Sequence, residues 1–153
     1  MQTMMLFDAF SIAYPDDLKL MSKEELDRFF GCNTNRYGFL HTDKHIVLTW
    51  TRQKGILAML TDTKSVVNGA YHKMKRNLPE FEKLENTQRM IAGQNAVGYR
   101  FCFKAKNVAV YQTGDVAVFK YKGSIYACAF YTHDNLYDEN HVIYDDILRS
   151  VQP

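Results

Sequence analysis

Histidines and cysteines are the side chains of this sequence most able to bind a metal or act as nucleophiles. They are His41, His45, His72, His133 and His141, and Cys32, Cys102 and Cys128. His41 and His45 flank a tight turn and could approach one ion. No cysteine or carboxylate accompanies them at the spacing of a transition-metal site. We therefore predict exposed histidines at the end of a hairpin, with no metal and no other cofactor.

The three cysteines are an odd number at wide spacing. This pattern fits neither a complete disulfide framework nor a zinc knuckle, so reduced thiols are expected. Cys102 and Cys128 lie among aromatic and aliphatic residues, which predicts that both are buried as small hydrophobic groups. Cys32 follows a glycine in a predicted loop and is expected to be exposed.

Motifs of nucleophilic and phosphate chemistry are missing from the sequence. There is no G-x-S-x-G elbow, no phosphate loop, no dinucleotide-binding glycine motif and no H-E-x-x-H helix. A nucleophile also needs a base and a group that orients the base, and no local pattern encodes such a set. We predict no catalytic residues and a protein that is not an enzyme, although assembly of such a set in space stays open.

Length and composition indicate one globular domain over residues 1–153. The 153 residues are 46% apolar and 24% charged, which is ordinary globular composition. No apolar run reaches the roughly 18 residues of a membrane-spanning helix, and the first residues lack the pattern of an export signal. These observations predict a cytoplasmic location and no membrane partner.

Charge is unevenly distributed although the net value is only +2. Residues 62–106 carry nine basic and four acidic side chains, whereas residues 107–153 carry three basic and six acidic ones. Lys73, Lys75 and Arg76 lie on a predicted helix and are candidates for contact with an acidic protein surface. The low net charge and the lack of a glycine-aromatic RNA motif argue against a nucleic-acid partner.

The first half of the chain predicts alternating strands and helices. Residues 7–14 alternate as a strand, and Ser22-Lys-Glu-Glu25 is a capping box that begins a helix closed by Gly31. Residues 37–41 and 45–51 predict a hairpin. The apolar run 56–60 is either a strand or a helix, and the spacing of apolar residues predicts a helix from about residue 63 to just before Pro79.

The second half predicts a β-meander followed by one helix. Residues 80–86 are acidic and resemble a solvated connection. Four strands are expected at 96–104, 108–112, 116–121 and 125–132, joined by the short connections 105–107, 113–115 and 122–124. A helix from about 137 to 151 should bury one apolar stripe. The members of that stripe are Val142, Ile143, Ile147 and Val151.

Aromatic residues make up 14% of the chain. Most must lie in the core, since each can bury roughly 150 to 250 Å². A sheet of this size seldom hides them all, so some tyrosines are expected on an open face. The candidates for a partner-binding patch are Tyr111, Tyr121, Tyr126 and Tyr131.

Several short sequences resemble landmarks of the PsbP-like and Mog-type superfamily. They are Phe10-Ser-Ile-Ala-Tyr-Pro15, Ala92-Gly93 before Tyr99-Arg-Phe101, Lys122-Gly-Ser-Ile-Tyr126 and Ile147-Leu-Arg-Ser-Val151. The resemblance covers nearly the whole chain from about Phe7. It implies an α+β fold of the α/β/α sandwich type around a central, mainly antiparallel sheet, used by relatives as a non-catalytic binding surface.

The relatives in this superfamily include photosystem extrinsic subunits, Ran-binding proteins and bacterial chaperones for secreted effectors. No metal-, Ran- or effector-binding motif of theirs matches here, so no functional residue is transferred. The sequence predicts a non-enzymatic protein-interaction module, either adaptor or chaperone, that uses the sheet face or the basic helix. The alternative is a small-molecule binder or enzyme with a pocket inside a cone-shaped α+β fold. A deep polar pocket would favour that alternative.

Overall fold

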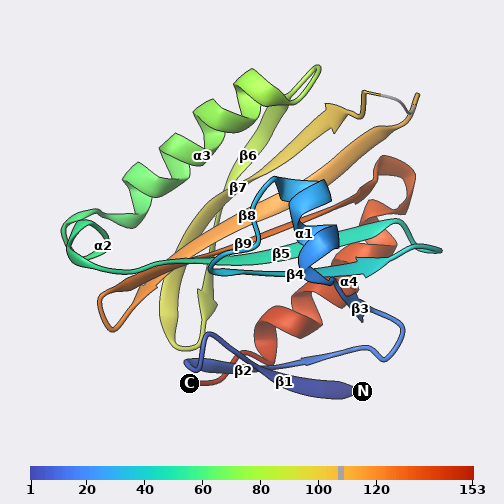
Figure 1. The fold of residues 1–153 in the computed structure, drawn as a ribbon. Coiled ribbons are helices and arrows are strands. Elements are labelled where there is room, and N and C mark those ends of the chain that lie inside the picture. Colours follow the sequence, from blue (N-terminus) through green and yellow to red (C-terminus); the bar gives the residue numbers. More distant parts are fainter. Residues whose placement is uncertain (107–108) are drawn as a thin grey trace.

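The residues that the structure describes form a large antiparallel sheet, a separate hairpin and four α-helices (Figure 1). The structure is a computed structural model, and it describes residues 1–106 and 109–153. The strands are β1 (Gln2–Leu6), β2 (Phe10–Tyr14), β3 (Lys19–Leu20), β4 (Arg36–His41), β5 (Ile46–Gln53), β6 (Glu82–Ile91), β7 (Gln94–Lys104), β8 (Tyr111–Tyr121) and β9 (Ser124–His133). The helices are α1 (Lys23–Phe30), α2 (Ile56–Leu60), α3 (Thr63–Asn77), the 3₁₀ turn Asp134–Leu136 and α4 (Tyr137–Arg149).

Seven strands form the sheet in the order β3-β4-β5-β9-β8-β7-β6, and all neighbours are antiparallel. Alternate residues of a strand point to opposite faces. In β8, Val116 and Val118 therefore pack in the core under α2 and α3, whereas Ala117 and Phe119 pack in the core under α4 and the β1–β2 hairpin. Elements cover both faces, which confirms the predicted α/β/α sandwich.

The helix starts follow their sequence signals. In α1 the Ser22 hydroxyl accepts a hydrogen bond from the Glu25 amide at 3.2 Å, and the Glu25 carboxylate accepts one from the Ser22 amide at 3.0 Å. Gly31 ends the helix with a left-handed φ of 70°. In α3 the Asp62 carboxylate accepts from the Ser65 amide at 2.7 Å. The predicted hairpin is β4–β5, and residues 56–60, left open by the sequence, form α2.

The predicted first strand at residues 7–14 is wrong at its start. Phe7 and Asp8 have φ angles of 57° and 56° and make the turn between β1 and β2, so the second strand begins at Phe10. Non-glycine residues seldom adopt these angles. The sequence offers no glycine or proline there to mark a turn, and for that reason the hairpin was missed.

Two predictions in the meander are also wrong. Residues 82–86 belong to the edge strand β6 and not to a solvated connection; the charged side chains that suggested a loop are typical of a protected sheet edge. Residues 113–115 are not a turn but the interior of β8. Asn107 and Val108, placed in a connection and a strand, lie outside the described residues.

Smaller corrections concern the last helix and one cysteine. The buried residues of α4 are Tyr137, Asn140, Tyr144, Ile147 and Leu148. Val142, expected on the inward stripe, is exposed. Cys128 is buried and Cys32 exposed, as predicted, but Cys102 is only half-buried.

Gly69→Ala should stabilise the protein. A Cβ at this position of α3 would meet no atom within 4 Å, and alanine is favoured over glycine in a helix by about 0.5–1 kcal/mol. We expect a urea-unfolding midpoint that rises by a corresponding amount. A lower midpoint would show that the α3 backbone is packed more closely than the structure indicates.

Gly114→Ala should have the opposite effect. A Cβ on Gly114 would lie 1.9 Å from the Phe130 carbonyl oxygen in the neighbouring strand, so β8 and β9 must separate. Overpacking of this kind costs about 3 kcal/mol. Unfolding in urea measures the loss, with Gly69→Ala as the matched glycine control, and an unchanged midpoint would contradict the register of β8 against β9.

Candidate functional site

An open groove crosses one face of the sheet between α1 and α3. It encloses about 340 Å³. Its apolar lining comes from α1, the end of α3, β7 and β9, and consists of Phe29, Phe30, Met74, Leu78, Phe101, Phe103, Ala129 and Tyr131. The floor follows from strand alternation, because Phe101, Phe103, Ala129 and Tyr131 point to the same side of the sheet.

A second cavity of about 370 Å³ adjoins this groove and shares Phe29, Phe103 and Tyr131 with it. We call the two together the sheet groove. The second part reaches the β4–β5 turn, where His45 stacks on His133 with ring centroids 3.9 Å apart. Burial, together with the nearby His45, lowers the pKa of His133. The two stacked imidazole rings therefore line this end of the sheet groove.

Arg36 brings a positive charge into the groove. Its guanidinium donates to the Thr49 hydroxyl at 3.0 Å and lies 4.6 Å from the centroid of the Phe30 ring. Within residues 1–106 and 109–153, no carboxylate lies within 4.0 Å of it. Burial lowers the pKa of Arg36, but an arginine keeps its charge at neutral pH. The groove therefore holds a half-buried cation with no anionic partner.

The structure brings two of the seven predicted site residues into the sheet groove. Tyr131 forms part of the floor and Lys73 part of the α3 side. Lys75 and Arg76 are exposed in the last turn of α3 but are not among the lining residues.

The other three tyrosines lie elsewhere. Tyr111 is 44% exposed and donates to Glu80 at 3.1 Å. Tyr126 is only 4% exposed, and both it and Tyr121 pack against Phe10 on the α4 side of the sheet. The four tyrosines therefore do not share one surface.

Sequence reasoning missed Phe29, Phe30 and Arg36 as groove residues. A signal was present for the first two, because an eight-residue helix that carries Leu26, Phe29 and Phe30 has more apolar surface than one contact can bury. Only Leu26 of the three is buried, and Phe29 is 41% exposed. Nothing in the sequence marked Arg36 as a groove residue, because its position in the groove depends on how α1 packs against β4.

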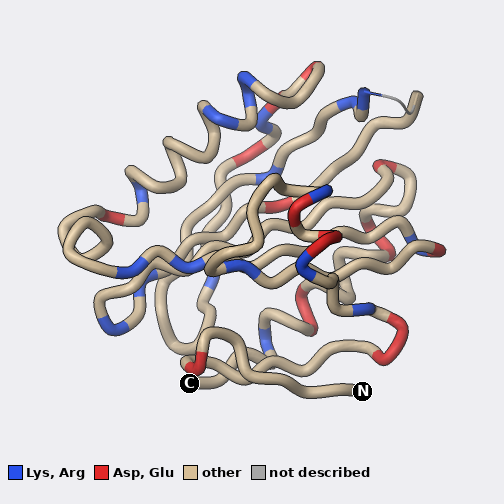
Figure 2. Tube along the Cα trace, viewed as in Figure 1, with Lys and Arg blue, Asp and Glu red and all other residues tan. Residues whose placement is uncertain are grey.

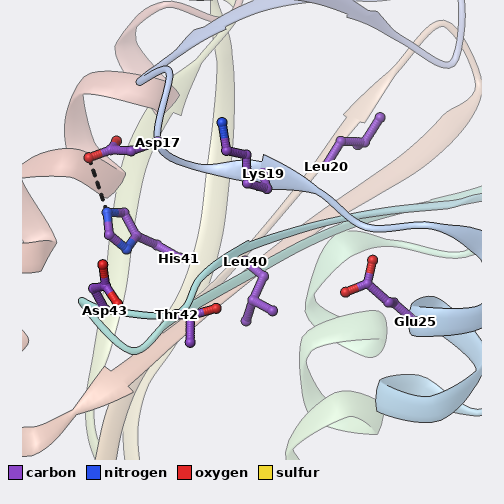
Figure 3. A pocket seen from close by; sticks show the side chains of 8 residues that line it. All are labelled: Asp17, Lys19, Leu20, Glu25, Leu40, His41, Thr42 and Asp43. Atoms are coloured by element: carbon purple, nitrogen blue, oxygen red, sulfur yellow. Dashed lines mark ion pairs between the residues drawn. The ribbon is translucent and has the colours of Figure 1, made fainter.

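A polar cavity of about 420 Å³ lies at the β3–β4 edge of the sheet, and Figure 3 shows its lining. His41 points towards Asp17, with Nε2 3.1 Å from the carboxylate, and its Nδ1 accepts from the Lys44 amide at 3.1 Å. The His41 side chain lowers the pKa of Asp17. His41 is thus buried and not exposed as predicted, because both of its ring nitrogens hold the turn. In the described part of the chain, no three metal-ligating side chains gather in one place.

A network of charged and polar groups lies under α4. Asp115 is bound by Arg100 at 3.1 Å and by the Tyr137 hydroxyl at 2.6 Å. Arg89 binds Asp145 at 2.7 Å, and His141 lies 3.5–3.6 Å from both carboxylates. Sequence reasoning missed the network because Asp115 was assigned to a turn.

The cavity beside this network measures about 180 Å³, below the roughly 300–1,000 Å³ of common ligand pockets. Its charged groups pair with one another. Cys128 is fully buried nearby, and burial raises its pKa well above the usual value. The thiol is therefore a poor nucleophile, and the network serves to fasten α4 onto the sheet.

Comparisons with known proteins support the fold. No protein-family model matches the sequence, and no curated protein matches it either. Three solved structures illustrate the structural likeness.

CyanoP, the cyanobacterial PsbP of Synechocystis sp. PCC 6803, has a TM-score of 0.65 and 14% identity over 95% of this chain and 86% of its own. The Ran-binding protein Mog1p of Saccharomyces cerevisiae has a TM-score of 0.62 and 7% identity over 99% of this chain and 94% of its own. A structure from Bacteroides thetaiotaomicron has a TM-score of 0.60 and 11% identity over 94% of this chain, which spans only 44% of that longer protein. At these identities the likeness concerns the fold alone, and the chain has the PsbP/Mog-like α+β fold that its sequence resemblance predicted.

Proposed function

We propose that this protein is a non-enzymatic interaction module, an adaptor or chaperone, that binds a segment of a protein partner in the sheet groove. The observation that carries the proposal is an open, mostly apolar groove that crosses the sheet and contains an arginine with no ion pair among the described residues. Mog1p, which is described as a Ran-binding protein, has the same fold, and this supports a role with a protein partner. The cytoplasmic location expected from the sequence is part of the proposal.

The chemistry of the groove describes the segment that would fill it. Aromatic side chains such as Phe29 and Tyr131 favour an apolar or aromatic anchor, because such groups supply most of the binding energy at interfaces. Arg36 favours a carboxylate next to that anchor, and Lys73 at the α3 side adds a second positive charge. The partner segment is therefore apolar with at least one acidic residue.

The alternative, a small-molecule binder or enzyme, has weaker support. Its pocket would be the cavity under α4, where His141, Asp115 and Arg100 converge. These groups already satisfy one another, and the space beside them is small for a ligand. The sheet groove is larger and open, and its Arg36 forms no ion pair with any residue that the structure describes.

Phe29→Ser should weaken partner binding while leaving the fold intact. The ring is 41% exposed and lines both parts of the sheet groove, so its loss removes contact area and little core. We expect about thirtyfold weaker binding, which corresponds to the roughly 2 kcal/mol of an interface hot spot. The measurement is affinity capture from the source cells with mass-spectrometric identification, followed by titration of the captured partner.

Tyr111→Ser is the matched control, because Tyr111 is similarly exposed but lies outside the groove. Both variants should keep the wild-type melting temperature. Arg36→Met, which keeps the stem and removes the charge, should also weaken binding. A partner held equally well by Phe29→Ser and wild type would rule out the sheet groove as its site.

A further inference from the structure

Helix α2 exposes four large apolar side chains at one end of the molecule. Ile56, Leu57, Met59 and Leu60 are 75%, 81%, 62% and 79% exposed, whereas Ala58 between them is buried. Figure 1 shows α2 beyond the sheet, just before the start of α3. Isolated exposed apolar residues are common, but four on five consecutive positions form a contiguous patch of the kind that marks an interaction surface. We call these four side chains the apolar tip.

The apolar tip is held in place by the body of the protein. Ala58 packs in the core under α3. The Lys120 ammonium, at the end of β8, donates to the carbonyl oxygens of Met59 at 2.8 Å and Thr61 at 3.2 Å. The turn that presents these side chains is therefore tied to the sheet at two points, so their exposure follows from the fold.

Basic residues surround the apolar tip. Within residues 52–64 and 120–124 the basic side chains are Arg52, Lys54, Lys64, Lys120 and Lys122. Arg52 is engaged with Phe7 and Asn35, and Lys120 holds α2, so Lys54, Lys64 and Lys122 are the basic groups left to contact a ligand. The acidic side chain of these segments is Asp62, which is occupied as the cap of α3. A second acidic residue, Asp8, lies in the β1–β2 turn. Arg52 reaches this turn and donates to the Phe7 carbonyl at 3.2 Å. Figure 2 shows lysine and arginine gathered at this end of the molecule.

We propose that the apolar tip inserts into the surface of an anionic lipid bilayer while the exposed Lys54, Lys64 and Lys122 bind the headgroups. A projecting apolar patch fits a deformable, planar interface. A basic surround complements the negative surface potential of anionic lipids. A protein partner would instead need a concave apolar site with an acidic rim. This proposal is independent of the sheet groove.

Surface contact is distinct from crossing the membrane. Among the described residues, no helix has both the length and the apolar character that crossing requires. The sequence-based expectation of no membrane partner rested on the lack of a spanning segment. The apolar tip departs from that expectation, because a five-residue helix with basic neighbours can bind an interface without spanning it.

Vesicle co-sedimentation tests the proposal. The vesicles are pure phosphatidylcholine or an equimolar mixture of phosphatidylcholine and phosphatidylglycerol. Wild type should bind the mixed vesicles, more weakly as salt rises, and should bind pure phosphatidylcholine poorly. Leu57→Gln with Leu60→Gln should abolish binding. Lys54→Gln with Lys122→Gln should lower the partition coefficient by about 30-fold, since each basic residue near the surface contributes about fivefold.

Leu84→Gln and Lys75→Gln are the matched controls, because both residues are exposed and lie outside the tip; neither should change vesicle binding. All variants should melt like wild type, since the replaced side chains are exposed. Failure of wild type to bind the mixed vesicles overturns the proposal. A second result would also overturn it: wild type self-associates in sedimentation velocity but does not bind vesicles, and the Leu57/Leu60 variant stays monomeric. The tip would then contact a second copy of the protein.

Discussion

The constraint on which the rest of the structure depends is that the central strands β8 and β9 are apolar on both faces. Val116 and Phe119 point in opposite directions from one strand, and both are buried. Burial of apolar surface contributes about 25 cal/mol per Å², so neither face can be left to water. The sheet therefore requires a cover on each side, and the two covers differ. On one side α4 and the β1–β2 hairpin close over the core, while on the other α1 and α3 leave the sheet groove between them.

The difference between the closed face and the open face of the sheet also determines how charged side chains are paired. Under α4, the buried Asp115 pairs with the half-buried Arg100 and accepts a hydrogen bond from Tyr137, whose pKa is raised by burial and by its bond to Asp115. An uncompensated charge in such a place would be strongly destabilising, so a closed face must pair its ions. Arg36 in the sheet groove is half-buried, and burial lowers its pKa, but the open groove leaves part of its side chain in contact with solvent. The open face is thus the one on which a charge can be kept free for a partner.

Local signals explain what could be predicted from the sequence. The capping box at Ser22 and the apolar spacing of α3 depend on neighbours in the chain, and both helices were correctly predicted. Gly114 was assigned to a turn because glycine usually marks one. In the structure it allows the Phe130 carbonyl to approach, a reason that exists only after β8 and β9 pair. Tyr126 and Tyr131 are an odd number of residues apart on β9, so alternation already placed them on opposite faces. The sheet groove itself depends on the packing of α1, which no local pattern encodes.

Helix α3 relates the two surfaces proposed here. It begins next to the apolar tip and ends at the sheet groove, and its 15 residues make it about 22 Å long at 1.5 Å per residue. Lys73 and Met74, which line the groove, lie about 15 Å along the helix from Thr63. The two surfaces share no residues, and a rigid helix separates them. Occupation of the apolar tip by a bilayer therefore leaves the sheet groove free for a protein segment, and coupling between the two sites would require α3 to move against the sheet.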